Sequence, residues 1–355
     1  DGNAQIFGFS ASADAGLTPL PGSPFPTTGK SALNTTGIGS ILFGIDSDNI
    51  DSFRINPDGC LSLENSTWAA QGVRSNPSLE PVFLYLDPTG TNLYSFDYNP
   101  PDGLQSKFAS YNFDATTGQV KQIGGDVAGG SGALAIASDD RYAVATYCSV
   151  RGGRFIGEYQ RGSDGALTFL RNAVYPSGLP GEQWCPGGIA ADGSDHVVVE
   201  VTPFTFESPP VDPNSLPRLA VYTLDGSGNL TTTSDSGNMI ESDFGPANYQ
   251  FSPDSRYLAA SGFAGLQIFA WDSASMTLKS IEIVKTGATC GSGSVCSVTP
   301  GFRNFAWDEN DHLFLIVGQQ LFVYAVSSSG VKPVSGSPYA VQKPQWVTVV
   351  PENSQ

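Results

Sequence analysis

The stretch FSPDSRYLAASGFAGLQIFAWDSASMTLKSIEI, from Phe251 to Ile283, contains the unit from which most of the chain is built. The runs YLAAS and LQIFAW are apolar, and the segment TLKSIEI alternates apolar with polar residues. The SPDS and DSAS segments predict turns, because proline fixes φ and serine and aspartate side chains hydrogen bond to nearby backbone. Together with the preceding ANYQF run, the stretch predicts four consecutive antiparallel strands, which we number first to fourth from the inside outward.

A recurring aromatic residue marks the third strand of this unit along the whole chain. It occurs seven times, at Phe7, Phe53, Tyr111, Tyr159, Tyr222, Phe269 and Tyr324. A single four-stranded sheet cannot bury both of its faces, whereas sheets packed radially can. The rival folds, a pair of β-sandwiches or a β-helix, do not explain a constant four-strand unit. We therefore predict an all-β fold, a seven-bladed β-propeller of four-stranded antiparallel blades, as a single domain over residues 1–355.

The two ends of the chain carry a second repeat. The segment LTPLPGSPF (Leu17 to Phe25) parallels VKPVSGSPY (Val331 to Tyr339). The chain thus begins at a third strand and ends after a first strand, and we expect the ring to close by pairing both ends in one composite blade. That blade either lacks one strand or has lost a strand upstream of residue 1. The sequence has no signal peptide, but it starts inside the repeat, so we expect upstream residues to have been removed.

The composition limits the classes of partner. The 355 residues include 34 acidic and 17 basic side chains, for a net charge of −17. Nucleic acid is a poor partner for such a surface, because phosphate binding requires basic patches. No apolar run reaches the roughly 18 residues of a membrane-spanning helix. We expect a monomer without a cofactor or metal, since two histidines without an acidic cluster do not make a zinc site.

The five cysteines leave two interpretations open. Buried free thiols are typical of cytosolic proteins, whereas disulfides indicate an oxidising compartment. The scarcity of lysine and the abundance of serine, threonine and glycine favour a secreted or otherwise extracytoplasmic protein. We then expect disulfides between Cys290 and Cys296 and between Cys148 and Cys185, with Cys60 left over.

The aromatic third strand, the Asp/Ser-Gly turn and the segment SPDSRYL together resemble the lactonase-type seven-bladed propellers. That family includes 6-phosphogluconolactonases and carboxymuconate cyclases, and the resemblance covers nearly the whole chain. Active members carry a histidine, typically in a His-Pro-His-like stretch, ahead of a first strand. The equivalent residues here, Pro77 to Pro81, read PSLEP and contain no histidine. His196 and His312 both follow the turn after a first strand, where we expect structural roles.

We expect the functional site on the face that carries the longer, variable loops, which join fourth to first strands and second to third strands. Ring opening or formation of a lactone needs a general acid or base and a cation for the developing oxyanion. The predicted catalytic residues on this face are Glu182, Glu241 and Arg303. The predicted substrate-binding residues are Arg74, Glu80, Arg154, Trp184, Asp243 and Lys343, with Trp184 as an apolar wall.

Two functions are consistent with this sequence. The first is a lactonase or cycloisomerase that acts on a small anionic lactone or carboxylate at the mouth of the central channel. The alternative is a non-catalytic exported propeller that binds a protein or glycan through the same loops. A funnel with converging arginine and glutamate side chains favours the enzyme, and a flat apolar face favours the binding protein.

Overall fold

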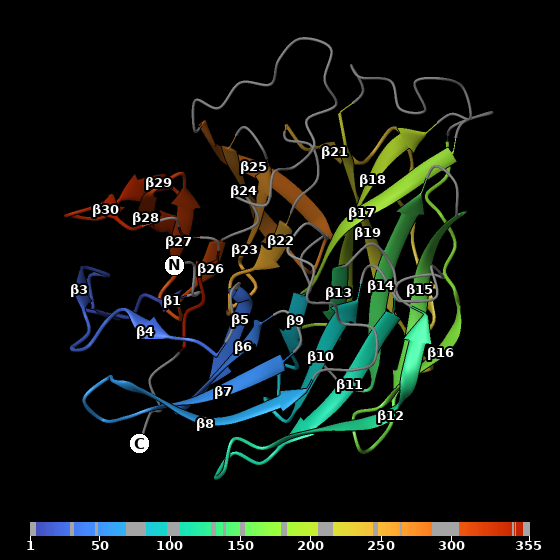
Figure 1. Ribbon diagram of the computed structural model, residues 1–355. Coiled ribbons are helices and arrows are strands. Elements are labelled where there is room, and N and C mark those ends of the chain that lie inside the picture. The colour runs from blue at the N-terminus through green and yellow to red at the C-terminus, as the bar shows by residue number, and fades with distance from the viewer. Residues whose placement is uncertain are drawn as a thin grey trace.

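The computed structural model describes residues 5–28, 32–46, 49–68, 83–97, 107–128, 133–137, 140–149, 153–178, 183–204, 216–243, 248–262, 265–285, 305–342, 344 and 346–350. These residues form an all-β propeller of four-stranded antiparallel blades. Figure 1 shows the blades following one another around a ring in chain order, from blue to red. None of the described segments is helical, and so none contains a helix that could cross a membrane.

Six sheets each contain four strands that pair in sequence order, and two of these sheets have a fifth, short strand. Blade 1 contains β5 (Ala32–Ile38), β6 (Ile41–Asp46), β7 (Asn49–Ile55) and β8 (Leu61–Trp68); blade 2 contains β9 (Phe83–Leu86), β10 (Asn92–Asp97), β11 (Lys107–Phe113) and β12 (Val120–Ala128); blade 3 contains β13 (Ala133–Ile136), β14 (Tyr142–Ser149), β15 (Gly153–Arg161) and β16 (Leu167–Asn172). Blade 4 contains β17 (Gln183–Ala191), β18 (His196–Phe204), β19 (Arg218–Leu224) and β20 (Leu230–Thr231), and β21 (Ile240–Glu241) also pairs with β19. Blade 5 contains β22 (Asn248–Phe251), β23 (Tyr257–Gly262), β24 (Gly265–Asp272) and β25 (Thr277–Lys285). Blade 6 contains β26 (Phe305–Trp307), β27 (His312–Val317), β28 (Gln320–Ser327) and β29 (Gly330–Pro333), and β30 (Tyr339–Ala340) also pairs with β28.

Blade 5 is the stretch that predicted the fold. Its first turn is closed by Ser252, whose Oγ accepts from the Tyr257 backbone N–H at 3.1 Å, and by Asp254, whose carboxylate accepts from the Arg256 N–H at 3.0 Å. Every residue of β23 is buried, because this second strand has a neighbouring blade on each side. The predicted strands and turn chemistry are therefore confirmed in this blade.

The recurring aromatic residue lies on the third strand of all six blades. Five of the six are almost completely buried, and they fill the space between neighbouring sheets: Phe53, Tyr111, Tyr159, Tyr222 and Phe269. Buried tyrosines need a partner for the hydroxyl group. The Tyr159 hydroxyl donates to the Ala128 carbonyl at 2.6 Å, and the Tyr222 hydroxyl donates to the Val174 carbonyl at 3.0 Å. These bonds fasten the fourth strand of one blade, or the loop after it, to the next blade.

The prediction of seven four-stranded blades is not met by the described residues. The seventh aromatic, Phe7, lies between two short strands, β1 (Gln5–Ile6) and β2 (Phe9–Ala11), which pair only with β4 (Phe25–Pro26) and β3 (Leu17–Pro19), respectively. The aromatic residue here accompanies only counterparts of a third and a fourth strand, and the described strands at the two ends of the chain do not pair with one another as the composite blade predicts. Figure 1 shows these strands between blade 6 and blade 1.

The repeat that joins the two ends is also a structural repeat. The Gly8 N–H donates to Ser23 Oγ at 3.0 Å, and the Val323 N–H donates to Ser337 Oγ at 2.9 Å. A cis peptide bond follows each of these serines. The two segments also touch, since the Leu17 N–H donates to the Tyr339 hydroxyl at 3.0 Å.

Both histidines lie on the face of the ring that carries the short turns. His196 Nδ1 lies 2.9 Å from Asp192 Oδ2, and His312 Nδ1 lies 2.8 Å from Asp308 Oδ2. Asp192 also accepts from the indole N–H of Trp271 in the next blade, at 2.9 Å. The two histidine–aspartate pairs therefore stabilise turns between first and second strands, on the face opposite the predicted site.

Candidate active site at the junctions of blades 3, 4 and 5

One position of the second strand is polar in three successive blades. In each blade, this residue pairs with the third-strand residue that lies three positions before the recurring aromatic. It is Thr146 in blade 3, Glu200 in blade 4 and Ser261 in blade 5, and all three are buried; the same position holds Ile45, Phe96 and Ile316 in blades 1, 2 and 6. The polar substitutions therefore cluster in one half of the ring.

Glu200 has the most unusual environment of the three residues. Its side chain is directed toward blade 5, on the same face of β18 as Val198, and the residue is 1% exposed. Oε2 accepts from the Gly188 N–H at 3.2 Å, and Thr202 Oγ1 donates to Oε1 at 3.5 Å. Burial raises the pKa of Glu200 to about 8, although the Gly188 N–H and the nearby hydroxyl groups of Tyr249 and Thr202 act in the opposite direction. A carboxyl group with this pKa is mostly protonated at neutral pH.

A bulge in the innermost strand of blade 4 makes room for this group. The pairing of β17 with β18 shifts between Pro186 and Ile189, which leaves Gly187 and Gly188 opposite Glu200. A Cβ atom on Gly187 would lie 3.0 Å from Glu200 Oε2, and one on Gly188 would lie 2.2 Å from Cδ2 of Tyr249. Both positions require glycine for the carboxyl group and the tyrosine ring to approach the strand this closely.

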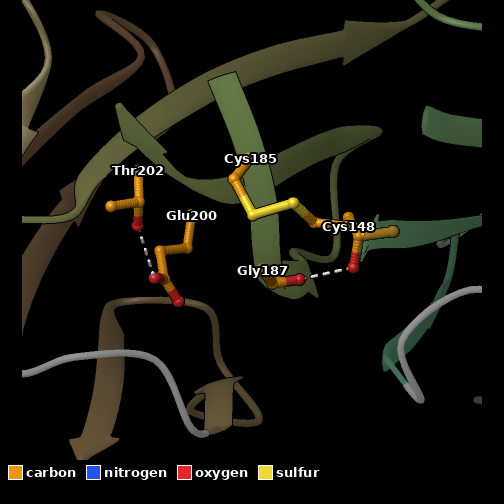
Figure 2. The surroundings of a disulfide bond; sticks show 6 residues. Cys148, Cys185, Gly187, Glu200 and Thr202 are labelled. Carbon is orange, nitrogen blue, oxygen red and sulfur yellow. Dashed lines mark hydrogen bonds between the residues drawn. A yellow bond between two sulfur atoms is a disulfide. The ribbon is translucent and has the colours of Figure 1, made fainter. Parts of the chain in front are cut away.

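The disulfide lies on the other side of the same bulge. Cys148 of β14 is bonded to Cys185 of β17, with their Cα atoms 5.3 Å apart, and so the predicted pairing is confirmed. Thr146 Oγ1 donates to the Gly187 carbonyl, which adds a second link between blades 3 and 4. Figure 2 shows the Glu200 carboxyl group and the disulfide near Gly187. Cys60 is a free thiol, and the predicted pair Cys290 and Cys296 lies outside the described residues.

A group of polar residues at the edge of blade 5 connects Glu200 to the predicted segment Glu241 to Asp243. Ser242 is buried between the two exposed acids, and its Oγ lies 3.4 Å from the Tyr249 hydroxyl. The Asp243 N–H donates to Oε1 of the buried Gln267 at 2.9 Å. The predicted segment therefore borders the Glu200 site through the serine between the two acids.

The four predicted site residues that the structure describes occupy different environments. Glu241 is exposed and lies 3.6 Å from Arg218, and Asp243 is exposed. Arg154 lies opposite Cys148 in the pairing of β14 with β15, beside the disulfide. Trp184 packs into the core between blades 3 and 4, and its indole N–H donates to the Pro176 carbonyl at 3.0 Å. The other predicted residues, Glu182, Arg303, Arg74, Glu80 and Lys343, lie outside the described residues.

Neither a protein-family model nor a curated protein matches the chain. Solved structures do match. A candidate 6-phosphogluconolactonase from Bacteroides fragilis NCTC 9343 is 19% identical and superimposes with a TM-score of 0.53, covering 78% of this chain and 76% of that one. The chain has the lactonase-type propeller fold. The resemblance predicted from the repeats is thus confirmed for the fold.

Two further structures share this fold. A protein from Lactobacillus plantarum is 16% identical, with a TM-score of 0.57 over 80% of this chain and 79% of that one. A functionally unknown protein from Desulfotomaculum acetoxidans DSM 771 is 12% identical, with a TM-score of 0.58 over 89% and 91%. At these identities the likeness concerns the backbone, and the chemistry has to be argued from the residues of this chain.

Glu200 was not among the residues predicted from the sequence, although the sequence carries a signal for it. The second strand HVVVEV places one carboxyl group in an otherwise apolar run, in a strand expected to be buried on both faces. A buried carboxyl group has a perturbed pKa, and such groups gather at functional sites. Tyr249 gives no such signal, since an aromatic residue is ordinary in an inner strand.

The arrangement provides the parts of an acid–base site on a lactonase-type scaffold. Glu200 can hold or release a proton near neutral pH, and Thr146 and Thr202 supply hydroxyl groups beside the bulge. The described residues contain no group of three or more histidine, cysteine, aspartate or glutamate side chains that could hold a metal ion. Proton transfer is the chemistry that the raised pKa of Glu200 supports.

Proposed function

We propose that the protein is a lactonase-like enzyme that opens or forms the ring of a small anionic lactone or carboxylate, with Glu200 as its general acid and base. The raised pKa of the buried Glu200 carboxyl group carries this proposal, because efficient general acids have a pKa close to the working pH. The activity for which the Bacteroides fragilis protein is a candidate, 6-phosphogluconolactonase, supports the choice of a lactone.

In this scheme, Glu200 gives up one proton during hydrolysis and takes one back. Protonated Glu200 donates to the ring oxygen as the carbon–oxygen bond breaks, and water adds its oxygen to the carbonyl carbon. The proton that water releases then returns to the Glu200 carboxylate. Arg154, beside the disulfide, is a candidate for binding the substrate carboxylate. Glu182, Glu241 and Arg303 remain candidates for further contacts with the substrate.

The proposal is tested with a panel of sugar and aromatic lactones. We expect turnover of at least one of them and a loss of about 100-fold or more in kcat for Glu200→Gln. Glu158→Gln is the matched control, since Glu158 is equally buried but accepts from the Leu230 N–H at 3.1 Å, on the face of blade 3 toward blade 4. Unchanged turnover in Glu200→Gln, or no turnover of any lactone by the natural protein, would refute the proposal.

A binding protein without catalytic activity is the second candidate. The observation that favours it is the exposure of apolar side chains in loops of the predicted functional face: Val174 is 61%, Tyr175 38% and Leu216 40% exposed. A panel of immobilised glycans and surface proteins would reveal such a ligand. The binding would then be lost in Val174→Ser and Tyr175→Ser but kept in Glu200→Gln.

We further infer that the ring has seven sectors. Phe9 and Leu17 at the start of the chain and Val347 and Val349 at its end pack against the same core cluster of blade 6, which supports a composite seventh sector. Removal of residues 5–28 should then lower the melting temperature.

We also infer that the protein works outside the cytoplasm. The Cys148–Cys185 disulfide supports an oxidising compartment. The protein purified without reductant should then contain one free thiol from the three described cysteines.

A further inference from the structure

The peptide group that joins Gly187 to Gly188 has a side-chain partner at each end. Thr146 Oγ1, in the second strand of blade 3, donates to the Gly187 carbonyl, and the Gly188 N–H donates to Glu200 Oε2 at 3.2 Å. This peptide bond is trans, since the cis bonds of the described chain lie elsewhere, and its carbonyl and N–H therefore point in opposite directions. The contacts form a line from Thr146 through the backbone to Glu200.

The bulge explains why this peptide group takes partners outside the regular strand pairing. The register of β17 against β18 shifts between Pro186 and Ile189, and Gly187 and Gly188 have no paired residue in β18. A buried backbone group without a hydrogen bond is costly, so the carbonyl and the N–H need other partners. Thr146 of the neighbouring blade and the Glu200 side chain supply them.

We propose that Thr146 is a positioning residue for Glu200: its hydroxyl group fixes the Gly187–Gly188 peptide so that the Gly188 N–H is directed at the Glu200 carboxyl group. The proposal rests on the proposed function and adds to it a residue of another blade that sets how strongly the protein stabilises the ionised form of the acid.

Two properties of the peptide make it depend on Thr146. Glycine on both sides leaves the peptide group freer to rotate than any other pair of residues would, because neither side carries a Cβ atom. A donor on the carbonyl also polarises the peptide and strengthens its N–H as a donor. Both effects favour the charged carboxylate, since an N–H can donate to it and cannot accept from a neutral acid.

The disulfide holds Thr146 close to the bulge. Cys148 follows Thr146 by two residues in β14, and Cys185 precedes Gly187 by two residues in β17, so the covalent bond fastens the same two strands beside the hydrogen bond. In blades 1, 2 and 6 the residue equivalent to Thr146 is apolar and cannot donate. The hydroxyl group is therefore present where the neighbouring first strand has a carbonyl to offer.

The test follows the protonation of Glu200 without any substrate. The infrared C=O band of the protonated carboxyl group is measured against pH, with Glu200→Gln as the spectral reference. In Thr146→Val we expect the midpoint of this titration to rise by about 0.5 pH unit or more, because the N–H that favours the charged form is no longer held in place. Thr146→Ser keeps the hydroxyl group and should keep the natural midpoint.

Tyr222→Phe is the matched control for a general loosening of the same junction. The Tyr222 hydroxyl donates to the Val174 carbonyl at 3.0 Å, and so it joins blades 3 and 4 as Thr146 does, but not through the bulge. Its loss should leave the midpoint unchanged. Tyr249, the titratable neighbour that acts on Glu200 in the described part of the chain, is kept in every variant.

An unchanged midpoint in Thr146→Val, or an equal rise in Tyr222→Phe, would overturn the proposal. Circular dichroism and thermal unfolding check that Thr146→Val is folded, and if it is not, Thr146→Ala decides by the same criterion. In an active enzyme, the alkaline limb of the pH–kcat profile should move with the midpoint, while KM changes little. Turnover that survives Glu200→Gln would refute the proposed function but leave the titration result standing, so the two failures can be told apart.

Discussion

Arg161 of blade 3 donates through Nη2 to Oδ2 of Asp87 in blade 2, at 2.6 Å, and both side chains are buried. Arg161 also contacts Asp140 and the Tyr94 hydroxyl. Its guanidinium therefore joins blades 2 and 3 on the face of the ring that carries the short turns. We expect Arg161→Met to lower the free energy of unfolding by about 3–5 kcal/mol, because it leaves the Asp87 carboxylate buried without its cation. Urea unfolding at pH 7 measures this change.

The control is an exposed ion pair at another turn of the same face. Arg256 contacts Asp254 and Asp311, but its side chain is 62% exposed. Arg256→Met should therefore cost about 1 kcal/mol or less. A loss in Arg161→Met that is no larger than this would contradict the role given to the buried pair.

The glycine pair of the bulge gives a graded prediction. Gly188→Ala places a methyl group within 2.2 Å of the Tyr249 ring, whereas Gly187→Ala places one 3.0 Å from a carboxylate oxygen. We expect Gly188→Ala to destabilise the protein by about 1–3 kcal/mol or more and Gly187→Ala by less. Gly125→Ala, where a Cβ meets nothing within 4 Å, should be neutral or slightly stabilising. Equal melting temperatures of the two bulge variants would show that the ring does not press on the strand.

The fold could be predicted from the sequence because each blade carries its own local signals. The SPDS turn, the buried second strand and the aromatic third strand of blade 5 each specify structure within a few residues. The composite sector shows the limit of that logic. Phe7 is the recurring aromatic residue of this sector, but its neighbours Gln5–Ile6 and Phe9–Ala11 pair with one strand each. The aromatic residue alone therefore does not predict a four-stranded blade.

The site was harder to predict because it is formed by contacts between blades. Glu200 and Tyr249 are in different blades, and the packing of β17 against β22 brings these blades together. The sequence indicated the loop segment Glu241 to Asp243, whereas the structure places the buried residue between these acids, Ser242, next to Tyr249. Trp184 was expected to line the site by its position in a loop, but its place in β17 directs it into the core. Periodicity predicts which strands exist and says little about which side chains meet across a junction.

The disulfide should contribute strongly to stability. It closes a loop of 37 residues and joins two neighbouring blades, and the chain-entropy relation gives about 4 kcal/mol for such a loop. We expect the double variant Cys148→Ala/Cys185→Ala to lose between about 2 and 5 kcal/mol of unfolding free energy. Cys60→Ala, which removes the free thiol, is the matched control and should change it by less than about 1 kcal/mol. A reductant should lower the melting temperature of the natural protein but not that of the double variant.

The protonation of Glu200 makes a prediction for the pH dependence of stability. The pKa of its carboxyl group is about 8 in the folded protein, against 4.5 for an ordinary glutamate. Below about pH 4.5 both states hold the proton, but between the two values only the folded state keeps it. The free energy of unfolding therefore falls by about 1.4 kcal/mol for each pH unit over this interval, on account of this group alone.

Glu200→Gln removes this contribution, since an amide does not titrate. We expect the stability of the variant relative to the natural protein to rise by about 2–3 kcal/mol between pH 5.5 and pH 7.5, as measured by urea unfolding at both pH values. Taking the difference between the two proteins cancels the titration of all other groups that the substitution does not disturb. Parallel pH profiles would mean that Glu200 ionises in the folded protein as it does in the unfolded chain, and the acid–base role proposed for it would lose its physical basis.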